Sequence, residues 1–241
     1  MVISRRLPRA LRLWDDDSFR GATPRGERGT KPHMPVQVLL WDIGGVFLTN
    51  GWDTPARERL ARRFQLDFAA FEARHQAVVD AFERGQMDEA EYWRQTVLAV
   101  AAPGTVEPAA LRAFLRAQSR PCDETLALLR ELAESGRWQL GMLNNESREL
   151  NQYRIDYFGL NRYFTVCFSS CWMDARKPDA LIYERALNLL QRRPEEIVFT
   201  DDREQNLVYP RMMGWRTIHF QNAAQLREEL RRCGVDPARA A

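Results

Sequence analysis

The spacing of short apolar segments along the second half of the chain most constrains its fold. Segments of strand length, rich in β-branched or aromatic residues, alternate there with stretches whose apolar residues recur at helical spacing. The expected strands are 36–41, 138–143, 163–168, 196–200 and 215–220, and the expected helices are 147–158, 179–191, 204–213 and 222–234. This alternation predicts right-handed βαβ crossovers, and so an α/β fold with a parallel sheet and helices on both faces.

The first expected strand is followed by a long helical stretch before the second strand arrives. Four segments in it carry apolar residues at helical spacing: 54–64, 67–85, 87–100 and 106–118. Pro103 and Gly104 separate the last two segments, and a further helix is expected at 123–135. We therefore expect a core formed by 34–52 and 120–241, with residues 53–119 as a helical insert that caps the strand ends.

Composition and charge exclude several functional classes. Hydrophobic residues make up 45% of the chain and charged residues 28%, and no stretch approaches the roughly 18 to 20 apolar residues of a membrane-spanning helix. Residues 1–33 hold eight Lys/Arg against four Asp/Glu, leaving 27 against 29, so the body offers no basic surface for nucleic acid. Residues 1–33 lack the apolar block of a secretory signal, and we expect a disordered extension on a cytoplasmic protein.

The four cysteines do not indicate a metal or disulfide framework. Cys122, Cys167, Cys171 and Cys233 are irregularly spaced, and the three histidines are scattered. Cys167 and Cys171 could form a metal or redox pair, but Cys167 falls within an expected strand, where a small buried apolar residue is the usual explanation. Free thiols in a reducing compartment are the simpler expectation.

Polar residues stand where several expected strands end. In a parallel sheet those ends meet at one edge, where ligands bind. The residues are Asp42, then Asn144 and Asn145, then Asp201 and Asp202, with Lys177 on the loop after the third strand. Taken singly, Asp202 could cap a helix, and the Asn-Asn and Lys-Pro pairs could form turns. Together, three carboxylates and a lysine indicate Mg²⁺ and an anionic substrate.

Four sequence motifs carry a family resemblance. "LLWDIGGVF", "LGMLNNES", "RKPDALIYERAL" and "IVFTDDREQNLVYPRMMGW" resemble, in order and spacing, the motifs of the haloacid dehalogenase-like hydrolases, over about residues 34 to 236. The branch most similar contains sugar-phosphate phosphatases and the N-terminal phosphatase domain of epoxide hydrolase. The resemblance implies a Rossmann-like core with an inserted helical cap. It also implies Mg²⁺-dependent hydrolysis of a small phosphorylated metabolite through an aspartyl-phosphate.

The resemblance also implies a role for each motif residue. Asp42 would be the nucleophile, and Lys177 would neutralise the phosphoryl charge. Asn144 and Asn145 would bind the phosphoryl oxygens. The Mg²⁺ ligands would be Asp42, Asp202, Asp201 and the backbone carbonyl of Gly44, with Asn206 in support.

Two positions depart from the family pattern. Most phosphatases of this family carry a second Asp, the general acid and base, where this chain has Gly44, and a Ser or Thr where it has Asn144. Glu146 and Asp53 are candidates to replace the missing acid. Two alternatives follow: a binding or regulatory protein whose catalysis is impaired, or a haloacid dehalogenase, against which the retained Asp201 and Asp202 argue. Trp52, at the entry to the insert, could contact substrate or pack in the hinge.

Overall fold

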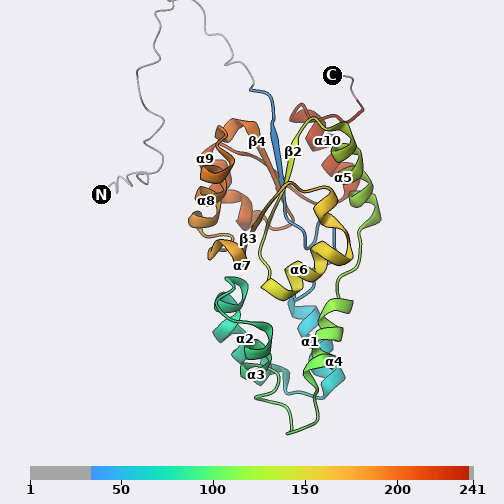
Figure 1. Ribbon diagram of the computed structural model, residues 1–241, viewed down its shortest axis with the longest axis vertical. Helices are drawn as coiled ribbons and strands as arrows, with labels where there is room; N and C mark the ends of the chain where they lie inside the picture. Colours follow the sequence, from blue (N-terminus) through green and yellow to red (C-terminus); the bar gives the residue numbers. More distant parts are fainter. Residues whose placement is uncertain (1–33, 239–241) are drawn as a thin grey trace, which may run out of the picture. The chain divides into compact units, whose positions relative to one another are not determined.

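The structure, a computed structural model, describes residues 34–238, whose centre is a five-stranded parallel sheet (Figure 1). The strand order is β3-β2-β1-β4-β5, so the first strand of the chain lies in the middle. The strands are β1 (Val38–Trp41), β2 (Gln139–Asn144), β3 (Val166–Ser169), β4 (Ile197–Asp201) and β5 (Arg216–His219). All five expected strands are therefore present, and every pairing between them is parallel.

Helices cover both faces of this sheet. The four residues of β1 are all buried, and alternate side chains point into two different clusters. Leu39 packs on the face covered by α5 (Asp123–Ser135) and α10 (Ala223–Arg232), whereas Leu40 packs on the face covered by α8 (Ala180–Leu190) and α9 (Val208–Met213). Two short helices complete the core, α6 (Arg148–Tyr157) and α7 (Ser170–Met173). This arrangement confirms the α/β, Rossmann-like prediction.

The side chains of the expected insert, 53–119, form a further apolar cluster, which Leu150 of α6 joins. The helices of the insert are α1 (Thr54–Phe64), α2 (Phe68–Glu83), α3 (Glu89–Gln95) and α4 (Pro108–Ala117). Aspartates at the starts of α1, α2 and α3 accept a hydrogen bond from a backbone N–H of the first turn, which explains why these helices begin where they do. The cluster joins the rings of Phe71, Tyr92 and Trp93 to Leu60 and Leu111.

Two expected helices are shorter or less regular than their patterns predict. The helix expected at 87–100 ends at Gln95, where the backbone of Thr96 leaves the helical conformation while its hydroxyl donates to the carbonyl of Tyr92. The helix expected at 204–213 begins as a 3-10 turn, Glu204–Leu207, before α9. No helix within residues 34–238 is long and apolar enough to cross a membrane. The expected extension, 1–33, lies outside the described residues.

A buried histidine lies in the interior of the insert. The Tyr92 hydroxyl accepts a hydrogen bond from the Trp52 indole N–H at 2.7 Å and shares another, also 2.7 Å, with Nδ1 of His75. Nearby, Arg57 forms a bidentate ion pair with Glu72. Burial, followed by the charge of Arg57, lowers the pKa of His75 to about 4.

Acid should therefore destabilise the protein through His75. In the unfolded chain His75 takes up a proton near its ordinary pKa of 6.5, whereas in the folded protein it stays neutral until about pH 4. The free energy of unfolding is therefore highest above pH 6.5 and falls as the pH drops from 6.5 to 4. The loss is about 3 kcal/mol. We expect urea unfolding between pH 7 and 4.5 to show a loss larger by about 2 kcal/mol in the wild type than in His75→Gln. Equal pH dependence in both proteins would contradict the assignment.

Candidate active site

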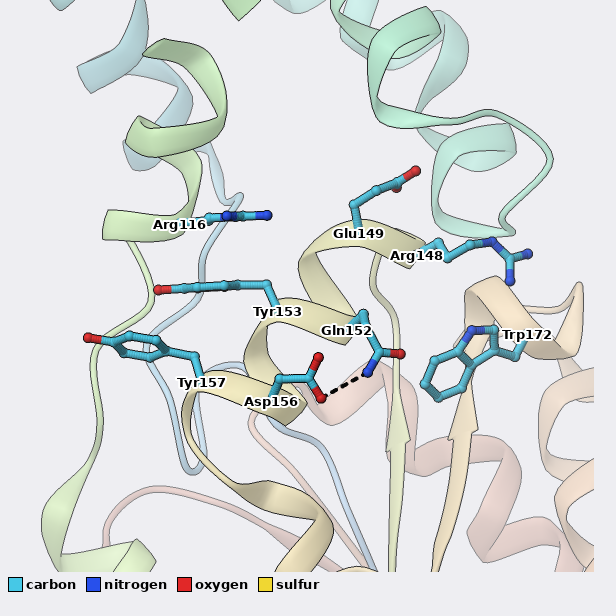
Figure 2. A pocket seen from close by; sticks show the side chains of 8 residues that line it. All are labelled: Arg116, Arg148, Glu149, Gln152, Tyr153, Asp156, Tyr157 and Trp172. Carbon is cyan, nitrogen blue, oxygen red and sulfur yellow. Dashed lines mark hydrogen bonds between the residues drawn. The ribbon is translucent and has the colours of Figure 1, made fainter. Parts of the chain in front are cut away.

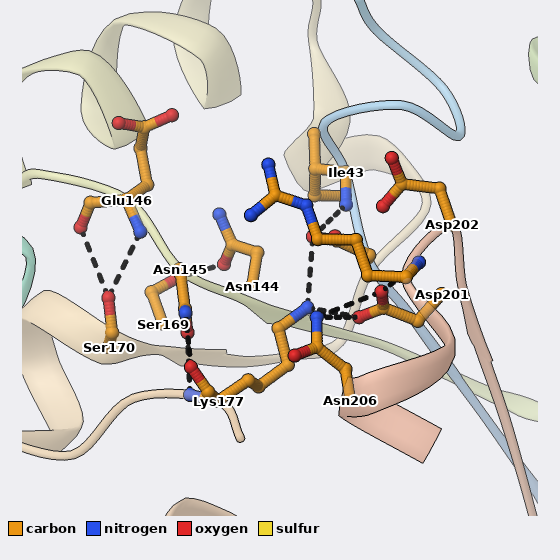
Figure 3. Close-up of polar contacts among 12 residues, drawn as sticks. Ile43, Asn144, Asn145, Glu146, Ser169, Ser170, Lys177, Asp201, Asp202 and Asn206 are labelled. Carbon is orange, nitrogen blue, oxygen red and sulfur yellow. Dashed lines mark hydrogen bonds and ion pairs between the residues drawn. The ribbon is translucent and has the colours of Figure 1, made fainter. Parts of the chain in front are cut away.

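Three carboxylates and one lysine meet at the carboxyl edge of the sheet (Figure 3). Asp42 directly follows β1, and Asp201 ends the neighbouring strand β4, so the parallel register brings them together. One oxygen from each of Asp42, Asp201 and Asp202 lies within 4.8 Å of the others. The Lys177 Nζ lies 3.2 Å from Asp42 Oδ1 and 2.6 Å from Asp201 Oδ2. The sequence predicted this meeting of strand ends, and the structure places Lys177 in contact with Asp42 and Asp201, with Asp202 beside them.

The two aspartates that contact Lys177 differ in how many hydrogen bonds their carboxylate oxygens accept from the protein. Asp201 is fully buried, and both of its oxygens accept hydrogen bonds from the Asn206 amide, while Oδ1 also accepts from the backbone N–H of Arg203. In Asp42, Oδ1 faces Lys177 and accepts from the Ile43 N–H, and no donor within residues 34–238 is bonded to Oδ2. Burial raises the pKa of Asp42 to about 7 against the lowering effect of Lys177.

Asp202 presents the oxygen best suited to a cation. Its Oδ2 accepts a 3.2 Å hydrogen bond from Asn50, but its buried Oδ1 has no hydrogen-bond donor within the described part of the chain. A buried carboxylate oxygen without a donor is costly unless a cation satisfies it. Gly45 (φ +77°) passes so close that a Cβ atom there would lie 2.2 Å from Asp202 Oδ2. Hard oxygen ligands in this arrangement fit Mg²⁺.

The two asparagines after β2 have different positions. Asn145 lines the cavity, but its side chain donates to the Lys177 carbonyl and accepts from the Lys177 N–H, both at 2.8 Å. The Asn144 side chain is buried, donating to Asn151 Oδ1 and accepting from the Ser169 hydroxyl. The structure thus explains Asn145 as a residue that holds the Lys177 loop. Phosphoryl contacts from either side chain remain a prediction.

A cavity of about 70 Å³ opens beside these carboxylates. It is lined by Asp42, Gly44, Lys177 and ten further polar, glycine or charged residues, together with Trp52. Four of its charged residues were not predicted: Arg154, Arg176, Arg203 and Glu83. Arg176 and Arg203 stand directly beside the motif residues Lys177 and Asp202 in the sequence. Arg154, on α6, and Glu83, at the end of α2, are brought to the site only by the fold.

Trp52 and Asp53, whose roles the sequence leaves undecided, also line the cavity. The Trp52 indole packs edge-on against Trp93, with ring centroids 5.5 Å apart, and donates to Tyr92. These contacts agree with the expectation that Trp52 packs where the chain enters the insert. Asp53 accepts a hydrogen bond from the Ala56 N–H at 2.9 Å and so caps α1. Neither contact needs a ligand.

The chain matches the family model described as haloacid dehalogenase-like hydrolase over residues 36–207. The chain belongs to the haloacid dehalogenase-like hydrolase family. It is 25% identical over 195 residues to the sesquiterpene phosphatase astK of Aspergillus oryzae, a match that covers 81% of this chain and 95% of that protein. It is 38% identical over 71 residues to bifunctional epoxide hydrolase 2 of Mus musculus, covering 30% of this chain and 13% of that one.

A solved structure shares the fold of this haloacid dehalogenase-like hydrolase. It is a haloacid dehalogenase family enzyme of Bacteroides thetaiotaomicron, in complex with magnesium and inorganic phosphate. The TM-score is 0.63 at 20% identity, and the match covers 78% of this chain and 95% of that one. The two proteins therefore have the same overall arrangement of strands and helices.

Contacts at the end of α2 hold the insert of this hydrolase against its core. We call them the latch. The Arg176 guanidinium lies 2.9 Å from Glu83 Oε2, Arg84 pairs with Asp179, and the Ser170 hydroxyl donates to the Glu83 carbonyl. Glu83 and Arg176 also line the cavity. The latch and the cavity wall therefore share residues.

A larger open cavity, about 760 Å³, lies beside α6 but contains none of the predicted site residues (Figure 2). Its lining includes the stacked rings of Tyr153 and Tyr157, with centroids 5.1 Å apart, and Arg116 over Tyr153 at 4.8 Å. Arg154, on the same helix, lines the smaller cavity instead. The carboxylate cavity is thus the site whose residues can carry chemistry.

Proposed function

We propose that this hydrolase is a Mg²⁺-dependent phosphomonoesterase that acts on a small phosphorylated metabolite. The observation that carries the proposal is the contact of Lys177 with Asp42 beside a buried Asp202 oxygen that has no donor within residues 34–238. Three arginines, Arg154, Arg176 and Arg203, line the same cavity. An anionic substrate and a divalent cation would satisfy these charges, and the phosphatase relative supports the same reading.

The geometry suggests how Asp42 would act. Because Lys177 and the Ile43 N–H both contact Oδ1, the other oxygen, Oδ2, is left to attack phosphorus. A P–O bond to Asp42 forms as the ester P–O bond breaks, and water then cleaves the aspartyl-phosphate to release inorganic phosphate. Bound Mg²⁺, held by Asp42, Asp202 and the Gly44 carbonyl with Asp201 in support, would neutralise phosphoryl charge. Lys177, fixed by Asp201, adds a second positive charge.

We also propose that residues 53–119 act as a cap on a core of 34–52 and 120–241. The insert contributes Glu83 to the cavity wall, and Trp52 lies where the chain enters it. Such a cap would select the substrate by contacting its organic part and would exclude water during reaction. Cytoplasmic location is part of the same proposal, because a metabolite ester of this kind would be met there.

Phosphate release from a panel of phosphate esters tests the function. We expect turnover of at least one small ester with Mg²⁺, and loss of that turnover when a chelator removes the metal. Adding excess Mg²⁺ after the chelator should restore the turnover, which would show that the chelator removed the metal and did not damage the protein. Tight Mg²⁺-dependent binding of phosphate esters without turnover would instead favour a regulatory protein. Halide release from a 2-haloacid that persists in chelator would favour a dehalogenase.

A further inference from the structure

We propose that Glu146, oriented by Arg154, is the catalytic residue that protonates the leaving group, an inference that rests on the proposed phosphatase function. An alkoxide is a poor leaving group without a proton donor, and position 44, two residues after Asp42, is a glycine with no side chain to supply one. The donor must therefore come from elsewhere in the cavity.

Four carboxylates line the cavity, and three have other duties. Asp42 is the proposed nucleophile, Asp53 caps α1, and Glu83 belongs to the latch on the insert. Glu146 lies on the core, just after β2, where its backbone N–H donates to the Ser170 hydroxyl at 3.0 Å. It is therefore fixed to the same rigid sheet edge as Asp42 and Lys177.

Arg154 connects Glu146 to the space beside Gly44, and all three residues line the same cavity. Its Nη1 lies 2.8 Å from Glu146 Oε2, and it would lie 3.7 Å from a Cβ atom added to Gly44. The ion pair thus reaches the region that a side chain at position 44 would enter. Asn50 occupies the rest of that region, with its Oδ1 2.8 Å from the same Cβ position.

Arg154 is itself held from several sides. Its side chain is 3% exposed, its Nε donates to the Ser119 hydroxyl at 3.0 Å, and its Nη2 donates to the Thr49 carbonyl at 3.3 Å. A Cβ atom at Gly51 would lie 2.2 Å from Nη2, so the guanidinium fills space that only glycine leaves. This fixed position orients Glu146 without further motion of the core.

The surroundings of Glu146 act on its protonation in both directions: Oε1 accepts a 3.0 Å hydrogen bond from the Ser147 N–H and Oε2 pairs with Arg154, while burial favours the neutral acid. Its side chain is 10% exposed, and burial raises the pKa of the carboxyl although Arg154 opposes the shift. In the proposed step, the ester P–O bond breaks and the leaving oxygen takes the proton of the Glu146 carboxyl. The resulting carboxylate then takes a proton from the water that attacks the aspartyl-phosphate, which returns Glu146 to its acid form.

Leaving-group dependence in Glu146→Gln tests the proposal. p-Nitrophenolate leaves readily without a proton, whereas an alkoxide does not. We expect the first turnover of an alkyl phosphate to slow by about 10² to 10⁴-fold and that of p-nitrophenyl phosphate to change by only a few fold. Release of p-nitrophenolate should then show a burst, because the second step also lacks its base. Partial unfolding of the variant would lower the rates with both esters by the same factor, so the ratio of the two rates depends only on the chemical step.

Asp53→Asn is the matched comparator, because asparagine also caps helices and the cap of α1 is kept. We expect it to change both rates by the same factor. Equal slowing of both esters in Glu146→Gln, no slowing of either, or a selective loss of alkyl-ester turnover in Asp53→Asn would each overturn the proposal. If the wild type released phosphate from neither ester, the phosphatase function itself would fail, a result distinct from these three.

Discussion

Replacement of Asp42 by asparagine is expected to abolish phosphate release, with a fall in kcat on the order of 10⁶-fold, as for removal of a nucleophile in other hydrolases. The amide has no negative charge and does not attack phosphorus, while the neighbouring carboxylates and Lys177 stay in place. Steady-state phosphate release with Mg²⁺, on the best ester of the panel, measures the effect. Residual activity within tenfold of the wild type would rule out Asp42 as the nucleophile.

The same variant should lose no stability in the absence of divalent cations. Burial makes the ionised Asp42 costly and raises its pKa to about 7, and asparagine removes that charge. We expect a melting temperature at least equal to that of the wild type. A large fall would mean that lost activity reflects misfolding, and not the absence of a nucleophile.

Replacement of Lys177 by methionine is expected to cost both stability and activity. The Lys177 side chain is 1% exposed, and its loss would leave Asp42 and Asp201 without their shared cation. Breaking a buried ion pair by removing one partner typically costs about 3 to 5 kcal/mol. For a protein of this size we expect a fall in melting temperature of about 10 °C, measured without Mg²⁺. Arg94→Met, which removes an exposed helical ion pair, should leave the melting temperature nearly unchanged.

A double variant separates the charge of Lys177 from its packing. If the cost comes from uncompensated carboxylates, adding Asp201→Asn to Lys177→Met should recover part of the stability, with a coupling of about 0.5 to 3 kcal/mol. Activity should stay lost, because the positive charge of Lys177 beside Asp42 is still missing. Additive losses in the two single variants would show that Lys177 and Asp201 stabilise the fold independently.

The sequence predicted most of the core because its signals are local. Each strand of the sheet reads as a short apolar run, and helices 54–64 and 123–135 have the predicted ends, with Asp53 capping the start of the first and Gly136 following the end of the second. The errors came from changes of backbone conformation that apolar spacing does not report. The backbone of Thr96, for example, leaves the helical conformation, so α3 ends before the apolar pattern does.

The candidate site was predictable only where its residues stand at strand ends. Asp42 and Asp201 follow neighbouring parallel strands, so their meeting follows from topology. Arg154 could not be predicted in the same way, because its position depends on how α6 turns and on contacts to Thr49 and Ser119, far away in the chain. Asn144 was recognised from its motif, but the motif did not predict that its side chain donates a hydrogen bond to Asn151.

The latch links the effect of a bound ligand on the insert to the effect of ionic strength. Arg176 pairs with Glu83 of the insert and also lines the cavity, so a phosphate ester bound as proposed would compete with Glu83 for this guanidinium. We expect such binding to weaken one contact of the latch, and salt to weaken the neighbouring pair of Arg84 with the half-exposed Asp179. If residues 53–119 move as the proposed cap, we expect higher ionic strength to shorten the time that a ligand stays bound, whereas the buried ion pair of Arg154 with Glu146 should be screened much less.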